Sequence, residues 1–185
     1  MVDLLQLQKH FILSHIKAGD TVADFTMGNG YDTLFLSQTV GEDGFVYAFD
    51  IQPNALLSTE KRLKDANAPQ NYRLICDSHH NLKSYIKEPI KAGMFNLGWL
   101  PGNGNHEVTT LWETTKPAIE AAMSILAPDG IILIAVYPGH KEGTHEGEQL
   151  EAFLSIPDRT QYCCSKFRIV NSPASPYFFI IEKKA

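Results

Sequence analysis

Two closely spaced glycines, Gly28 and Gly30, interrupt a short apolar run at residues 22–25, and a segment with helical spacing starts directly after them at residue 32. Glycine has no Cβ and reaches backbone conformations with positive φ, so a ligand can approach the chain closely at such a turn. The free N–H groups and the positive end of the following helix would then face that ligand. The stretch therefore predicts a strand, a tight glycine turn and a helix N-terminus that together form a binding loop.

A second apolar run at residues 45–50 ends in Asp50. An acid at the end of the next strand can accept both hydroxyls of a ribose, as in nucleoside-binding βαβ units. The dinucleotide fingerprint G-x-G-x-x-G is only partly met, because Thr33 stands where the third glycine would be. The loop therefore suits S-adenosylmethionine (SAM), which has a ribose and no phosphates, better than a nicotinamide dinucleotide. A glycine turn that merely connects a strand to a helix stays open as the alternative.

Strand-like and helix-like segments alternate along the chain, which predicts a largely parallel sheet covered on both faces. The last two strand-like segments alternate like an antiparallel pair. We therefore expect one domain over residues 1–185 with an α/β, Rossmann-like fold: a mostly parallel seven-stranded sheet, helices on both faces and one antiparallel strand near the C-terminus. The expected strands are 21–25, 45–50, 72–76, 94–99, 131–137, 162–170 and 177–182. The expected main helices are 4–16, 32–38, 53–66, 109–126 and 146–153.

Polar side chains cluster where the first five expected strands end. In open parallel sheets, ligands bind beyond the carboxyl ends of the strands. Core packing alone does not explain polar groups at so many strand ends, so these clusters predict one shared site. The clusters lie at residues 24–30, 50–52, 77–79, 96–99 and 137–140.

The formal net charge of −5 argues against broad coating of nucleic acid, which depends on many Lys and Arg contacts to phosphate. A local basic patch that receives one RNA loop stays open. The candidate residues for such a patch are Lys9, Lys141, Arg159, Lys166 and Arg168.

Three cysteines, of which Cys163 and Cys164 are adjacent, form neither a disulfide framework nor a metal-spaced set. His140, His145 and Glu146 crowd one segment but lack the H-E-x-x-H spacing, so we expect no metal. No apolar run is long enough to span a bilayer, and the N-terminus has no basic-then-apolar pattern. We therefore expect a cytoplasmic protein.

Six pieces of the chain, in order, match one known family. The most specific are Asn-Leu-Gly-Trp-Leu-Pro at 96–101 and Tyr-Pro-Gly-His at 137–140; the others lie at 24–36, 46–52, 77–79 and 180–183. With these pieces the chain resembles class I SAM-dependent methyltransferases. More narrowly, it resembles the small bacterial family long labelled rRNA methylases, whose members are now assigned as tRNA methyltransferases acting on 5-aminomethyl-2-thiouridine at the wobble position.

The resemblance implies how the chain would hold the amino-acid part of SAM. Backbone groups around Met27, Gly28, Asn29 and Gly30 would bind the methionine moiety, and Asp24 would lie near its ammonium group.

For the nucleoside part of SAM, the resemblance implies that Asp50 takes the ribose hydroxyls with Gln52 beside it. Asp77, Ser78 and His79 would border the adenine. An exposed surface carboxylate is the alternative for Asp50, and a helix cap is the alternative for Asp77.

The segment from Asn96 to Trp99 lies where amine methyltransferases hold the nucleophile. An amide carbonyl and a backbone carbonyl can together accept two N–H bonds from an amine, which must be neutral to react. Desolvation alone favours the neutral amine, and no residue stands out as the base. Tyr137 and His140 are candidate catalytic helpers, with structural roles as the alternative. Trp99 would stack on an unpaired base or pack in the core.

These inferences favour a SAM-dependent N-methyltransferase that modifies the aminomethyl group of a tRNA wobble uridine, converting nm5s2U to mnm5s2U. The tRNA anticodon loop is the expected partner, and a homodimer is a candidate assembly. The alternatives are methylation of rRNA or of a small-molecule amine, and a nucleoside-binding module without chemistry. The Asn96–Trp99 stretch speaks against the last of these.

Overall fold

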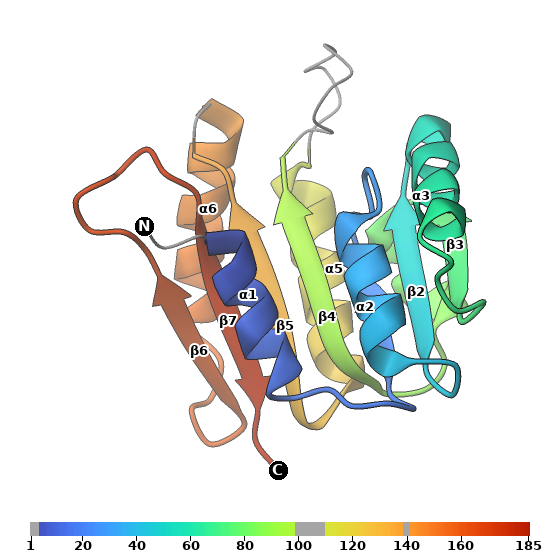
Figure 1. The fold of residues 1–185 in the computed structure, drawn as a ribbon. Coiled ribbons are helices and arrows are strands. Elements are labelled where there is room, and N and C mark those ends of the chain that lie inside the picture. The colour runs from blue at the N-terminus through green and yellow to red at the C-terminus, as the bar shows by residue number, and fades with distance from the viewer. Residues whose placement is uncertain (1–3, 99–109, 139–140) are drawn as a thin grey trace.

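The computed structural model describes residues 4–98, 110–138 and 141–185 of the chain. These residues form one seven-stranded sheet in the order β3-β2-β1-β4-β5-β7-β6 (Figure 1). The pairs β1–β2, β1–β4, β2–β3 and β4–β5 are parallel, whereas β7 is antiparallel to both of its neighbours. The strands are β1 Thr21–Asp24, β2 Phe45–Asp50, β3 Tyr72–Cys76, β4 Ile90–Leu97, β5 Leu126–Val136, β6 Tyr162–Phe167 and β7 Tyr177–Lys183. The predicted fold, with one antiparallel strand near the C-terminus, is confirmed.

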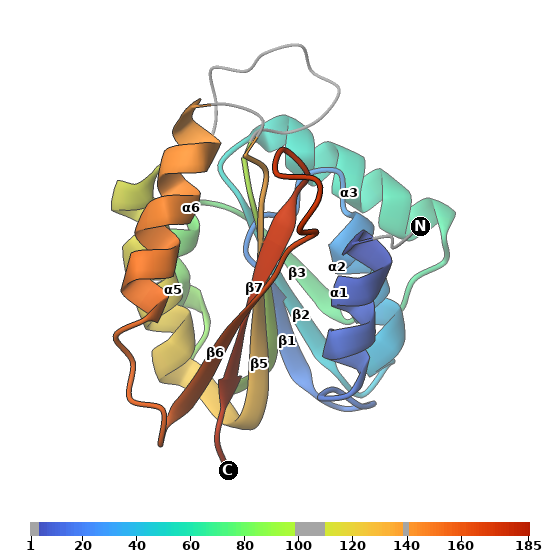
Figure 2. The ribbon, with the colours of Figure 1, turned by 90° about the vertical axis from the view of Figure 1, so that its left-hand side faces the viewer.

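Helices cover both faces of the sheet, as the alternating pattern predicted. Figure 2 shows α1, α2 and α3 on one side and α5 and α6 on the other. The helices are α1 Leu4–Leu13, α2 Tyr31–Val40, α3 Pro53–Asp65, α4 Leu82–Tyr85, α5 Trp112–Ile125 and α6 Lys141–Leu154, with a short 3₁₀ turn, η1, at His79–Asn81. None of the helices in the described ranges is long and apolar enough to cross a membrane.

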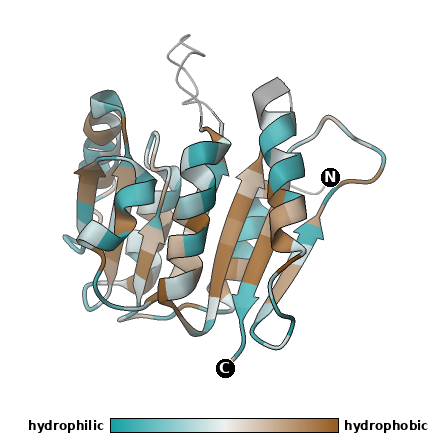
Figure 3. Ribbon diagram, turned by 180° about the vertical axis from the view of Figure 1, so that it is seen from behind, coloured by the Kyte–Doolittle hydropathy of each residue, from teal (hydrophilic) through white to brown (hydrophobic). Residues whose placement is uncertain are grey.

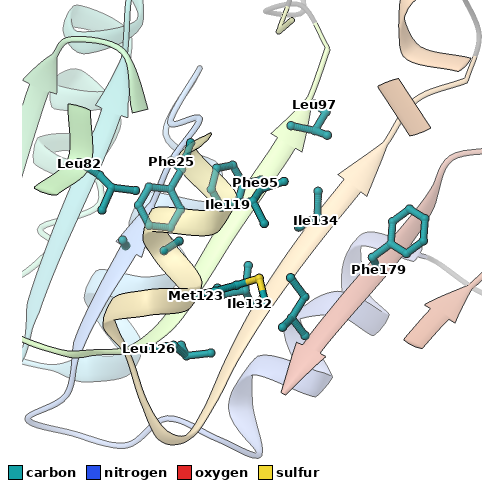
Figure 4. Packing of buried hydrophobic residues seen from close by; sticks show 14 of the residues in the cluster. Phe25, Leu82, Phe95, Leu97, Ile119, Met123, Leu126, Ile132, Ile134 and Phe179 are labelled. Carbon is teal, nitrogen blue, oxygen red and sulfur yellow. The ribbon is translucent and has the colours of Figure 1, made fainter. Parts of the chain in front are cut away.

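The core consists of two apolar layers, one on each face of the sheet. Beneath α5, the Phe25 and Phe95 rings stack with centroids 4.4 Å apart, and Ile119 and Ile132 belong to the same cluster (Figure 4). On the other face, α1 and α2 contribute buried residues such as Ile12. Figure 3 shows the apolar middle of the sheet beneath helices whose outer surfaces are largely hydrophilic.

Two strands begin earlier than their apolar runs predicted. Strand β4 starts at Ile90 rather than at Met94, because Ile90 pairs with Leu126 of β5 before the register shifts at Ala92. Strand β5 therefore starts at Leu126 rather than at residue 131 and continues through the Pro-Asp-Gly segment at 128–130. Asp129, with φ of 55°, lies in this irregular stretch.

The other differences concern element ends. Helix α1 ends at Leu13 rather than at residue 16, and β6 ends at Phe167 rather than at residue 170. Helix α6 begins at Lys141, five residues before the predicted start. Within this helix Gly147 has no side chain, which makes room for Tyr177, whose hydroxyl would overlap a Cβ at this position.

Candidate functional site

The carboxyl ends of β2, β1 and β4 lie side by side because these strands are neighbours in the sheet. The chain leaves β1 towards β2 and β3 on one side and returns to β4 on the other, so the sheet order reverses between β1 and β4. Such a switch point leaves a crevice outside the strand ends, where doubly wound folds bind their ligands. The loops at this edge carry most of the residues predicted from the sequence.

The glycine turn connects β1 to α2 and has the left-handed backbone that its sequence predicted. Gly28 has φ of 50° and Gly30 has φ of 78°. The Gly30 N–H donates to the Met27 carbonyl at 2.7 Å, and the Met27 N–H donates to the Phe49 carbonyl of β2 at 2.9 Å. The turn is therefore tied both to itself and to the neighbouring strand.

Helix α3 packs directly against the far side of this turn. A Cβ on Gly30 would lie 2.8 Å from the side chain of Thr59, so glycine is required there for space as well as for conformation. The Thr59 hydroxyl donates to the Gly28 carbonyl at 3.1 Å, and Arg62 Nε donates to the Asn29 carbonyl at 2.6 Å. Two carbonyls of the turn are thus engaged by α3, and the turn is held in place before any ligand binds.

Asp50, at the end of β2, faces the glycine turn. Its Oδ2 accepts the Gly28 N–H at 3.0 Å and its Oδ1 accepts the Gln52 N–H at 2.9 Å. Burial raises the pKa of Asp50, and the hydrogen bonds from the backbone of Gln52, Gly28 and Ile51 oppose that rise. Because an ionised carboxylate has about four acceptor positions, these three backbone hydrogen bonds leave acceptor capacity for a hydroxyl of a ligand.

Asp24 lies at the end of β1 and is completely buried. It accepts the Thr33 hydroxyl at 2.7 Å and the Thr26 N–H at 3.1 Å. Burial, followed by the nearby charge of Asp32, raises the pKa of Asp24 to about 7. Asp24 therefore stabilises the connection between β1 and α2, because each of its carboxylate oxygens accepts a hydrogen bond from a residue of that connection.

The segment after β3 also satisfies its own polar groups. Asp77 accepts hydrogen bonds from the Tyr85 hydroxyl at 2.8 Å and from Asn81 Nδ2 at 3.0 Å, and the bond from Tyr85 is the main cause that lowers the pKa of Asp77. Ser78 immediately precedes η1, and its hydroxyl lies 2.9 Å from His80 Nδ1. Asp77 thus organises this short segment through side-chain contacts, although the N-cap residue of η1 is Ser78 and not Asp77.

His79 is buried below the same edge. Its Nδ1 lies 3.0 Å from the Phe25 carbonyl, its ring meets Phe95 edge to face, and its Nε2 is buried without a hydrogen-bond partner. Burial lowers the pKa of His79, so the ring is neutral at physiological pH and Nδ1 carries the proton that the carbonyl accepts. The side chain therefore ties η1 to the end of β1.

Asn96, at the end of β4, is held from two directions. Its backbone N–H donates to Thr26 Oγ1 at 2.7 Å, and its side-chain Nδ2 donates to Asp32 Oδ2 at 2.8 Å. Asp32 lies in the first turn of α2 and is also 4.0 Å from Lys9 Nζ. The Asn96 amide therefore has a defined orientation, with Nδ2 towards Asp32 and Oδ1 on the other side.

Tyr137 follows β5 and lies next to β4. A Cβ on Gly98 would be 3.9 Å from the Tyr137 ring, which places the two strand ends in contact range. Burial, followed by the charge of Asp32, raises the pKa of Tyr137, so its hydroxyl stays protonated at neutral pH and is suited to donate a hydrogen bond. The other two predicted catalytic residues, Trp99 and His140, lie outside the described residues.

Sequence reasoning missed two members of this group, Asp32 and Thr26. The sequence pattern identifies Asp32 only as the start of a helix, and Thr26 only as part of the turn. The signal available for Asp32 was an acid in the first turn of the helix that follows a glycine turn, where helix dipoles favour negative charge. Its contact with Asn96 spans 64 positions of the chain and has no local signature.

No group of three or more His, Cys, Asp or Glu side chains suited to a metal is present within residues 4–98, 110–138 and 141–185. Cys163 and Cys164 lie on β6, and Cys76 lies at the end of β3. The described cysteines are all free thiols.

Two comparisons of sequence connect this arrangement with known proteins. A family model described as "Putative rRNA methylase" matches residues 46–183. The chain is also 39% identical over 179 residues to the chloroplastic tRNA (mnm(5)s(2)U34)-methyltransferase of Arabidopsis thaliana. That match covers 91% of this chain, and the chain spans 65% of the length of this relative.

Solved structures agree over nearly the whole chain. A Clostridium thermocellum protein that bears the same rRNA methylase description superposes with a TM-score of 0.95 at 40% identity, covering 99% of this chain and 98% of that one. A Streptococcus mutans protein, described as a "putative methyltransferase" and solved in complex with SAH, superposes with a TM-score of 0.89 at 32% identity, covering 99% of both chains.

Proposed function

The chain belongs to the rRNA methylase family, and on this premise we propose that it is a SAM-dependent N-methyltransferase acting on the wobble uridine of tRNA. The proposed reaction adds one methyl group to the aminomethyl substituent and converts nm5s2U to mnm5s2U. The name of the Arabidopsis relative supports this substrate, and the S. mutans complex with SAH supports the cofactor. The observation that carries the proposal is the joint placement of the Gly28–Asp50 pair and the Asn96–Asp32 pair at one edge of the sheet.

The residues at the ends of β1 and β2 fit SAM. The turn at Met27, Gly28, Asn29 and Gly30 is preformed by its contacts to β2 and α3, so little ordering is needed when a ligand binds. Asp50 keeps acceptor capacity for a ribose hydroxyl. When bound, the sulfonium of SAM supplies an electrophilic methyl group.

Further residues support the pocket at its rim and from beneath it. We assign Gln52, Asp77 and Ser78 to the rim that borders the nucleoside. Asp24 and His79 are buried, so we assign them to the support of the turn and of η1 rather than to direct contacts with the cofactor.

The β4 edge fits an amine nucleophile. Because Asp32 takes an N–H of the Asn96 amide, Oδ1 of that amide is directed to the remaining side, where it can accept an N–H from an amine. Thr26 fixes the backbone of the same residue. The resulting orientation of the amine lone pair is the positioning that a direct displacement requires.

The amine must lose a proton before it reacts. Tyr137 is not suited to take that proton, because its raised pKa keeps its hydroxyl protonated. The half-buried edge disfavours a charged ammonium group, and exclusion of water by a large RNA substrate would strengthen this effect. The protein thus orients a neutral amine, and solvent accepts the proton before the amine is enclosed.

The decisive experiment is mass spectrometry of nucleosides from tRNA that carries nm5s2U, after incubation with the protein and labelled SAM. The expected product is labelled mnm5s2U. Asn96→Ala is the matched control, because it should retain binding of SAH and lose product formation. Label in rRNA or in a small amine, with tRNA unlabelled, would contradict the proposed substrate while leaving the methyltransferase assignment intact.

A further inference from the structure

A groove of about 500 Å³ runs between α1 and α2 on the face of the sheet shown at the front of Figure 1. Lys9 and His10 line it from α1, and Tyr31, Phe35 and Gln38 line it from α2. Its volume lies within the range of small-ligand pockets. None of the residues that line the groove is among those assigned to the binding of the cofactor or of the nucleophile.

The groove adjoins the proposed nucleophile site through two consecutive contacts. Lys9, which lines the groove, has its Nζ 4.0 Å from Asp32 Oδ1. Asp32 in turn accepts the Asn96 amide at 2.8 Å. An RNA strand that places one base at Asn96 would therefore place the adjacent nucleotide in or beside this groove.

Tyr31 is a preset stacking surface at the groove. The residue is 63% exposed, more than any other Phe, Tyr or Trp among the described residues, and the guanidinium of Arg62 lies 3.5 Å from its ring centroid. Arg62 is itself fixed by the bond from its Nε to the Asn29 carbonyl. Because one face of the ring is supported in this way, stacking a base on the exposed ring would require little loss of side-chain freedom.

The described lining of the groove holds one lysine, Lys9, and no acid, although the Asp32 carboxylate lies 4.0 Å from Lys9 Nζ. The protein has 21 acidic and 16 basic residues, yet none of the described residues lining this groove is acidic. Lys9 is held over the Phe35 ring, 5.1 Å from its centroid, so the cation is positioned at the wall of the groove. The Lys9 ammonium at this wall can bind a phosphate, and RNA-binding proteins commonly combine cationic side chains with an aromatic platform for an unpaired base.

We propose that the α1–α2 groove binds an unpaired nucleotide next to the modified uridine, with its base on Tyr31 and its phosphate near Lys9. This inference rests on the proposed function, because it takes the RNA substrate from there. It adds a binding site, separate from the cofactor pocket, that would select for an RNA loop over a free small amine.

The test is fluorescence anisotropy with a labelled anticodon stem-loop RNA in the presence of SAH, combined with steady-state kinetics on whole tRNA. Tyr31→Ala should weaken RNA binding by roughly tenfold and raise KM with kcat retained, and Tyr31→Phe should restore binding. Lys9→Gln should weaken binding and lower the slope of log affinity against log salt by about one. Calorimetric affinity for SAH should not change in any of these variants.

Lys116→Gln is the matched control, because Lys116 is an exposed cation on α5, on the opposite face of the sheet. It should bind RNA as the wild type does. Wild-type RNA affinity in both Tyr31→Ala and Lys9→Gln, in an enzyme that methylates tRNA, would overturn the groove assignment alone. A wild-type protein that neither binds nor methylates any RNA would overturn the groove and the proposed function together. A change in self-association with RNA affinity unchanged would assign the groove to a second copy of the chain and also overturn the proposal.

Discussion

The side-chain amide of Asn96 donates a hydrogen bond to Asp32 at 2.8 Å, which joins the end of β4 to the first turn of α2. A planar amide held at one end cannot rotate freely, so the position of its oxygen is decided by a residue 64 positions earlier in the chain. In the proposed reaction that oxygen receives the nucleophile, and Asp32 acts as a positioning residue.

Replacing Asp32 by alanine should therefore reduce kcat and leave cofactor binding intact. Loss of the hydrogen-bond acceptor allows the Asn96 amide to rotate. Displacing a nucleophile by about 1 Å lowers the rate roughly tenfold to a hundredfold. Rapid-quench single-turnover methylation would measure the effect, with SAH affinity measured separately by calorimetry.

A double variant provides the control for this prediction. If Asp32 acts through Asn96, then adding Asp32→Ala to Asn96→Ala should lower the rate little further, because residues that act as a unit are not additive. Fully additive losses would show that Asp32 has an independent role, and an unchanged rate in Asp32→Ala would refute its positioning role.

Asp50→Ala should weaken SAM binding by roughly tenfold or more, because charge-assisted hydrogen bonds contribute about 1.5–3 kcal/mol each. The substitution also removes the acceptor of the Gly28 N–H, so the melting temperature without ligand should be measured beside the calorimetric affinity. Glu60→Ala, an exposed acid on α3, is a suitable control. An unchanged affinity for SAM would rule out the ribose contact.

Gly30→Ala should destabilise the fold more than Gly19→Ala. Both glycines have positive φ, so an alanine is strained at either position by about 1–2 kcal/mol. A Cβ at Gly19 meets nothing within 4 Å, whereas at Gly30 it would lie 2.8 Å from Thr59 and would push α3 from the turn. Urea unfolding should show a further loss of about 1–3 kcal/mol for Gly30→Ala, and equal losses would contradict the close packing of α3.

Stability should fall as the pH rises towards 7, and Asp24→Asn should reduce that fall. The pKa of Asp24 is about 7 in the folded protein against 3.8 for an ordinary aspartate, so between these values the folded state holds a proton that the unfolded state has lost. Stability therefore decreases as the pH rises through this window and levels off above 7. Urea unfolding from pH 5 to pH 8.5 would measure the difference between the two proteins.

Other titrating groups are common to both proteins in that comparison. The pKa of Asp50 is raised and acts in the same direction, and the lowered pKa of His79 acts in the opposite direction. The contribution of His79 cancels when Asp24→Asn is subtracted from the wild type, whereas part of the Asp50 contribution is included in the difference because the Asp24 and Asp50 carboxylates repel each other. Parallel stability curves for the two proteins would show that Asp24 does not titrate in this window.

Local sequence patterns were sufficient for most of the fold. The predicted boundaries of β2 and β3 are those of the structure, because each is a short apolar run bounded by turn residues. The pattern was less informative where tertiary contacts override it. Strand β4 begins at Ile90 because β5 offers a pairing partner there, and α6 begins at Lys141, five residues before the predicted start.

The amino-acid sequence by itself determined the α/β class, the antiparallel strand near the C-terminus, and the glycine turn followed by Asp50 at the end of the next strand. Those features depend on periodicity, on turn chemistry and on the free backbone of glycine, all of which are local. Only the tertiary structure decided that Asp24 and His79 are buried supports, and that Asp32 orients Asn96. Burial and long-range hydrogen bonds are set by the order of strands in the sheet, and no short stretch of sequence encodes which distant side chains that order brings together.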